Sequence, residues 1–150
     1  MHPITTPTHE SFDIASMSKS DSYKLLASVI LPRPIAWITS RAADGGLNAA
    51  PFSFFNIVSS DPPLIAVSFS DASDREGKDT LANIREHETF VVNLVSRELA
   101  EAMNITATNA PRGTDETALA GLTLSPSVVI DVPRIAASPA HFKICRSFFA

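Results

Sequence analysis

Residues 33–56 read R-P-I-A-W-I-T-S-R-A-A-D-G-G-L-N-A-A-P-F-S-F-F-N, and this stretch decides the fold. Two arms rich in β-branched, aromatic or small residues flank A-D-G-G at positions 43–46, which is typical of a tight turn between antiparallel strands. The stretch therefore predicts a β-hairpin. Because proline cannot donate a ladder hydrogen bond, we expect the second strand to break near Pro51 and to expose backbone amides beside aromatic side chains. Such a break can hold a flat, polar ligand.

Short helices are expected on both sides of this hairpin. Asp21 or Ser22 could cap a first helix, which must end before Pro32 because the proline ring forbids its continuation. A second short helix is predicted after Lys78, with Asp79 as its N-cap. Apolar periodicity and turn residues predict the remaining elements, which are strands at 64–70 and 89–95 and helices at 97–106 and 114–121.

Strands joined by short helices indicate a mainly β fold with an antiparallel barrel. A doubly wound parallel sheet would need crossover helices of about a dozen residues, and no G-x-G-x-x-G follows a strand. Residues 1–19 are rich in Ser, Thr, Pro and His and are predicted to form a flexible tail. We therefore expect one domain, at residues 20–150.

Composition excludes several classes of protein. The net charge is −4 without a basic run, which argues against nucleic acid as a partner, and no apolar stretch approaches the roughly 20 residues that span a bilayer. The N-terminus lacks the order of a secretory signal, and the single Cys145 excludes an internal disulfide, so a cytoplasmic location is expected. Cys145, with apolar neighbours, is expected to be buried or inert.

Lys78, Asp79 and Thr80 form the strongest candidate binding site. A lysine, a hydroxyl and the free backbone donors of a helix N-terminus can bind an anion there. The alternative is a solvated lysine beside an ordinary cap. Asp79 is expected to cap the helix rather than touch an anion, because two negative charges repel.

A second candidate site is the polar, backbone-rich segment that follows Pro51. Ser53, Phe54, Phe55 and Asn56 combine backbone amides, a hydroxyl and a side-chain amide. The alternative is that Phe52, Phe54 and Phe55 are core residues, which we expect for at least one of them. On the following strand, Ser68 and Ser70 share a face and either contact the ligand or face an edge.

Five motifs in order carry a resemblance to a known family: R-P-I-A-W-I-T-S, A-P-F-S-F-F-N, D-P-P-L-I-A-V-S-F, K-D-T-L-A-N-I and F-V-V-N-L-V. The chain resembles the flavin reductase-like, FMN-binding split-barrel proteins, a group that includes flavoredoxin-type proteins. The match runs from about Tyr23 to Val95, with weaker similarity to about Cys145. The resemblance implies an antiparallel split β-barrel.

What the resemblance implies about the site is specific. Lys78, with Asp79 and Thr80, would hold the FMN phosphate, and residues 53–56 would lie along the isoalloxazine ring. Thr39 and Ser40 would lie near the ring and the ribityl chain, and Ser68 would meet the ribityl chain or the phosphate. Redox chemistry belongs to the flavin, so we expect no catalytic acid–base pair. The scattered histidines give no reason to expect a metal site.

The resemblance also implies a function and partners. We expect an NAD(P)H-dependent flavin oxidoreductase that uses FMN, with FAD as the other possible flavin. It would act as a homodimer and pass electrons to free flavin, a partner monooxygenase or another acceptor. A non-enzymatic, flavoredoxin-like electron carrier and a split-barrel module without flavin are the alternatives.

Members of the family usually continue past the position of Phe149 with strands that complete the barrel. This chain stops within what should be a strand. We therefore expect a barrel that is C-terminally incomplete, with an unpaired edge.

Overall fold

The computed structural model describes residues 10–69 and 78–145. Contacts divide the chain into two units, Met1–Pro32 and Arg33–Ala150, and each is described here by itself. The first unit contains the 3-10 helix η1 (Ile14–Ser16), inside the stretch predicted as a flexible tail, and helix α1 (Lys19–Val29). The first nine residues of the predicted tail lie outside the described residues.

Helix α1 begins earlier than its predicted cap. Ser18 is the N-cap, and its hydroxyl accepts a hydrogen bond from the backbone N–H of Asp21 at 3.1 Å and donates one to the Asp21 carboxylate at 2.7 Å. The expectation that Asp21 or Ser22 caps the helix is therefore wrong, because the hydroxyl of the earlier Ser18 caps it instead. The helix ends before Pro32, as predicted.

The second unit is built on one antiparallel sheet with the strand order β2-β1-β5-β8. Two further pairs of strands, β3-β4 and β6-β7, are separate from this sheet. The mainly β fold with short helices is confirmed. The strands are β1 (Ala36–Arg41), β2 (Leu47–Phe52), β3 (Phe55–Ser60), β4 (Pro63–Val67), β5 (Phe90–Asn93), β6 (Leu124–Ser125), β7 (Arg134–Ile135) and β8 (His141–Ile144).

The predicted hairpin is strands β1 and β2. Its turn is closed by the Ala42 N–H bonded to the Gly46 carbonyl at 2.9 Å, and Gly45 takes a left-handed φ of +88°. Strand β2 extends past Pro51, however, and breaks only at residues 53–54. The reason is that β2 is an edge strand, which has a partner on only one side. The Ala49 N–H points away from β1, and residue 51, two positions later, faces the same open side. Pro51 therefore removes no hydrogen bond between β1 and β2.

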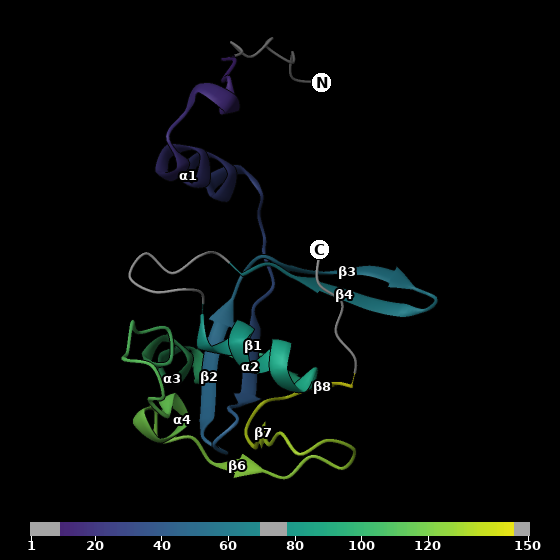
Figure 1. The fold of residues 1–150 in the computed structure, drawn as a ribbon. Coiled ribbons are helices and arrows are strands. Elements are labelled where there is room, and N and C mark those ends of the chain that lie inside the picture. The colour runs from purple at the N-terminus through teal and green to yellow at the C-terminus, as the bar shows by residue number, and fades with distance from the viewer. Residues whose placement is uncertain (1–9, 70–77, 146–150) are drawn as a thin grey trace. The chain divides into compact units, whose positions relative to one another are not determined.

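Short helices connect the strands, and α2 packs on the sheet over β1 and β2 (Figure 1). One sheet face and α2 enclose the main apolar cluster, formed by Ala36, Ile38, Ile84, Phe90 and Val92. The base of the β3-β4 pair packs against the same cluster through Phe55, Ile65 and Val67. The helices are α2 (Asp79–His87), the 3-10 helix η2 (Arg97–Leu99), α3 (Ala100–Ile105) and α4 (Glu116–Leu119).

The opposite sheet face is covered by the chain after β5. Trp37 is fully buried there, and its indole N–H donates to the Thr106 hydroxyl at 2.9 Å. Cys145, expected to be buried or inert, is exposed at the end of β8. In the part of the chain that the structure describes, no helix is long and apolar enough to cross a membrane.

Candidate functional site

The N-terminus of α2 has an open first turn. Lys78 is the N-cap residue in extended conformation, with φ −85° and ψ 145°, and no side chain of the described residues caps the helix. The prediction that Asp79 is the N-cap is wrong, because Asp79 is already the first helical residue. First-turn N–H groups that no side chain caps are suited to an anion, and the half-buried Lys78 adds a positive charge beside them.

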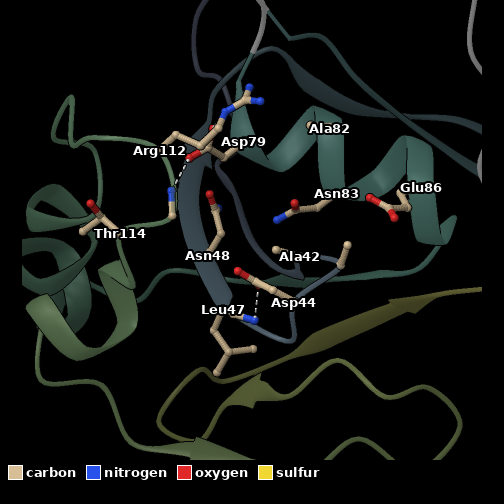
Figure 2. A pocket seen from close by; sticks show the side chains of 13 residues that line it. Ala42, Asp44, Leu47, Asn48, Asp79, Ala82, Asn83, Glu86, Arg112 and Thr114 are labelled. Atoms are coloured by element: carbon tan, nitrogen blue, oxygen red, sulfur yellow. Dashed lines mark hydrogen bonds and ion pairs between the residues drawn. The ribbon is translucent and has the colours of Figure 1, made fainter.

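Asp79 is instead bound to a distant loop. Its Oδ1 accepts a hydrogen bond from Arg112 Nε at 3.1 Å, and its Oδ2 accepts one from the Gly113 N–H at 3.4 Å (Figure 2). The Asp79 side chain is 13% exposed, whereas that of Arg112 is 59% exposed. Sequence reasoning missed Arg112 because 33 residues separate the pair and no local motif marks it.

Thr80 and Ser40 belong to a buried polar layer between α2 and the hairpin. The Thr80 hydroxyl accepts a hydrogen bond from Asn48 Nδ2 at 3.0 Å, and the Ser40 hydroxyl accepts one from Asn83 Nδ2 at 3.1 Å. Ser40 and Asn48 are also opposite each other in the β1-β2 register. These bonds attach the first two turns of α2 to the hairpin, so the position of the open helix end is determined by the sheet.

The two asparagines of this layer were not predicted. Asn83 is three residues after Thr80, which places both on the same helix face. Asn48 is opposite Ser40 once the five residues 42–46 between the two strands set the hairpin register. Both relations were present in the sequence and could have identified the layer.

Thr39 lies on the other sheet face, away from Ser40. Its hydroxyl donates to the Pro133 carbonyl at 2.7 Å and accepts a hydrogen bond from Asn93 Nδ2 at 3.3 Å. Side chains alternate along a strand, so adjacent residues cannot share a face. Thr39 is 1% exposed and Ser40 is 0% exposed, so both side chains serve the interior of this fold.

The segment from Ser53 to Asn56 lies where the chain leaves β2 and enters β3. Phe52 and Phe55 pack against the main cluster, as expected for at least one of the three phenylalanines, whereas Phe54 is 38% exposed. The Arg33 guanidinium is 5.9 Å from the Phe54 ring centroid, in a cation–π arrangement. Flat, partly exposed aromatic surface is therefore present at this break.

Polar groups surround the same break. Asn56 is exposed, and its side-chain Oδ1 accepts a hydrogen bond from the backbone N–H of Ile57 at 2.8 Å. Ser68 is exposed and donates its backbone N–H to the Phe54 carbonyl at 2.9 Å, which brings it beside the segment. Ser70 lies outside the described residues.

A cavity of about 330 Å³ opens between the hairpin turn, α2 and the loop at residues 112–114 (Figure 2). Asp44, Asp79 and Glu86 contribute carboxylates to its wall, and Arg112 contributes the one guanidinium. An excess of negative charge disfavours an anion. We therefore assign no phosphate to this cavity, although it shares Asp79 with the open end of α2.

Among the described residues of this unit, Glu116 carries the buried carboxyl group. It is 7% exposed and accepts a hydrogen bond from the Ala49 N–H at 3.2 Å, on the open edge of β2. Desolvation by burial raises the pKa of Glu116, and the nearby Asp79 and Asp115 carboxylates also raise it, whereas backbone hydrogen bonds lower it. Within the described residues, no group of three or more His, Cys, Asp or Glu side chains could hold a metal ion.

The family model described as "Flavin reductase like domain" matches residues 28–146, which is most of the chain. The chain belongs to this family. An uncharacterized protein of Deinococcus radiodurans is 41% identical over 143 residues, covering 93% of this chain and 63% of its own length. This flavin reductase-like domain thus spans less than two thirds of that relative.

Solved structures agree with the family assignment. Nitrilotriacetate monooxygenase component B from Bacillus cereus is 39% identical, with a TM-score of 0.87 over 92% of this chain and 68% of that one. A flavin reductase with a split barrel domain from Shewanella frigidimarina is 16% identical with a TM-score of 0.72, covering 87% of this chain and 63% of that one. The split-barrel fold predicted from the motifs is confirmed.

Proposed function

We propose that this domain binds FMN and, with NAD(P)H as reductant, passes electrons to free flavin or to a partner acceptor. The observation that carries the proposal is the open first turn of α2 with Lys78 at its cap, in a chain of the flavin reductase family. When bound, the flavin supplies the redox chemistry. FAD is the alternative flavin, and its larger nucleotide would need room beyond the same phosphate site.

The residues of the chain fit the FMN phosphate at the start of α2. Lys78 provides a cation, and no side chain of the described residues caps the N–H groups of the first turn. Thr80 contributes less directly, because its hydroxyl is already bonded to Asn48 and holds the helix end in place. We propose that Asp79 does not touch the phosphate, since its carboxylate is engaged by Arg112 and Gly113.

For the flavin ring, we propose the segment from Ser53 to Asn56 together with Ser68. Phe54 offers partly exposed aromatic surface, and the bend at residues 53–54 separates β2 from β3 at this point. Thr39 and Ser40 would act indirectly, because their buried side chains position the sheet and α2 rather than the ligand.

We further propose that two copies associate through the β3-β4 pair and that a monooxygenase is the electron acceptor. Ile57 and Val58 are 69% and 61% exposed, and Leu64 on β4 is 41% exposed. A β-bulge between Ile57 and Ser59 interrupts the alternation of side chains there, and exposed apolar side chains that cluster on one element are typical of a protein interface. The monooxygenase is suggested by the component B protein from Bacillus cereus.

A visible absorption titration tests the function. The purified protein is titrated with FMN and then with NADH and NADPH without oxygen. A perturbed flavin band that bleaches on addition of a nicotinamide nucleotide is expected. A bound flavin that neither nucleotide reduces would contradict the reductase and favour an electron carrier. Absence of any flavin binding would contradict both and leave a structural module.

A further inference from the structure

The start of α2 combines groups of opposite charge within three residues. Lys78 and the helix dipole attract an anion, but Asp79 is adjacent in sequence and is also in the first turn. Left by itself, the Asp79 carboxylate would cancel the Lys78 charge and repel a phosphate dianion. A phosphate site at this position therefore requires that the Asp79 charge be compensated.

Arg112 supplies that compensation. Its Nε is 3.1 Å from Asp79 Oδ1, and the adjacent Gly113 N–H is 3.4 Å from Asp79 Oδ2, so the loop engages both carboxylate oxygens (Figure 2). Only 13% of the Asp79 side chain is exposed, and so solvent screens its charge poorly. Arg112 thus offsets the negative charge of Asp79, which then no longer cancels the positive charge of the adjacent Lys78.

The same two bonds fix the direction of the carboxylate. An aspartate in the first helical turn can turn toward backbone N–H groups at the helix end. Here it faces the loop at residues 112–114, which also walls the cavity beside the hairpin turn. The Asp79 carboxylate therefore does not cap the first turn, and no side chain of the described residues does so.

We infer that Arg112 is a positioning residue for phosphate recognition, which neutralises Asp79 and holds its carboxylate away from the N-terminus of α2. This inference rests on the proposed FMN site and adds a residue that lies outside the K-D-T motif. It predicts that Arg112 matters for ligands that carry the phosphate and not for the ring alone.

The test compares FMN with riboflavin, which lacks the phosphate, by quenching of flavin fluorescence at low ionic strength. For Arg112→Gln, we expect the Kd for FMN to rise about fivefold to tenfold, while the Kd for riboflavin changes less than about twofold. Adding Asp79→Asn to that variant should restore most of the FMN affinity. Arg97→Gln, which changes an exposed arginine on η2, is the matched control.

Each outcome has a distinct meaning. If Arg112→Gln weakens FMN and riboflavin equally, or weakens neither, the role of Arg112 in phosphate recognition is overturned. The proposal that the wild-type protein binds FMN would still stand. If Arg112→Gln does not fold, Asp79→Asn alone decides: it should tighten FMN severalfold without affecting riboflavin, and an unchanged FMN affinity would overturn the inference. A wild-type protein that binds no FMN would overturn the proposed function and this inference with it.

Discussion

The two ends of strand β2 have very different surroundings. At its start, Asn48 is 6% exposed and hydrogen-bonded to Thr80, so polar groups are buried and paired within the chain. At its end, the chain leaves the sheet toward Phe54 and Ile57, which are 38% and 69% exposed. Buried polar groups must find partners within the fold, whereas exposed apolar groups gain from another surface. The first end is thus assembled by this chain alone, and the second is suited to a ligand or a second copy.

The sharpest test of this contrast concerns the exposed end. Ile57→Asp with Val58→Asp should prevent the proposed dimer, because burial of two such side chains contributes about 3 kcal/mol or more, a change of more than about a hundredfold in association. The fold should survive, since both side chains are exposed. The mass measured by light scattering during size-exclusion chromatography reports the association.

Val128→Asp with Val129→Asp is the matched control for that experiment. These valines are 89% and 66% exposed and lie on the loop between β6 and β7. The control should keep the mass of the wild-type protein. A dimer that survives the hairpin substitutions would contradict this interface, and a monomeric wild type would contradict the homodimer.

The proposed phosphate site is at the helix end that the bond from Asn48 to Thr80 attaches to the start of β2. It is tested by removing the positive charge of Lys78. Lys78→Ala should weaken FMN binding by about 1.5–3 kcal/mol, the contribution of a charged hydrogen bond, with little effect on riboflavin. Lys24→Ala, which removes an exposed lysine of α1, serves as the control. Isothermal titration calorimetry with FMN and with riboflavin measures the change in binding free energy. If the variant binds FMN with the affinity of the wild type, Lys78 does not contribute to phosphate binding.

The buried layer predicts an effect on stability rather than on ligand affinity. Asn83→Ala removes the hydrogen bond to Ser40 and leaves a buried hydroxyl without that partner, which should lower the free energy of unfolding by about 1–3 kcal/mol. Asn56→Ala, on the exposed segment, should lower it by less than about 0.5 kcal/mol. Urea unfolding measures both. Equal effects would show that the two ends of β2 do not differ in the way described.

Local signals in the sequence predicted several of the elements, but not strand β3, which begins at Phe55. The turn residues of A-D-G-G gave the hairpin, and apolar runs gave the strands that follow. The misplaced caps at Asp21 and Asp79 have one cause: several residues near a helix start can cap it, and tertiary contacts decide which does. Elements were therefore predicted more reliably than their first residues.

The candidate site was predicted only in part, for a different reason. Lys78 and Thr80 could be named as candidates from the sequence because K-D-T is a local motif. The contact of Asp79 with Arg112 joins residues 33 positions apart, and the bond of Asn93 to the Trp37 carbonyl joins residues 56 apart. Such pairs arise from packing and leave no periodic signal. The separation of Thr39 from Ser40, in contrast, follows from strand alternation and was open to prediction.

Glu116 gives the smallest expected effect and tests whether the buried end of β2 responds to pH. Its pKa is raised in the folded state, mainly by desolvation, so its protonated form is favoured in the folded protein. This stabilisation is fully present below the ordinary pKa of an unfolded glutamate and is lost as the pH rises through the raised pKa of the folded state.

Glu116→Gln keeps an acceptor for the Ala49 N–H but cannot ionise. Urea unfolding between pH 4 and pH 7 should therefore show a smaller loss of stability with rising pH in Glu116→Gln than in the wild type. Glu101→Gln, on exposed α3, should follow the wild type. If Glu116→Gln also follows the wild type, the carboxylate at the β2 edge is solvated in solution, and the contrast between the two ends of the strand is weaker than its burial indicates.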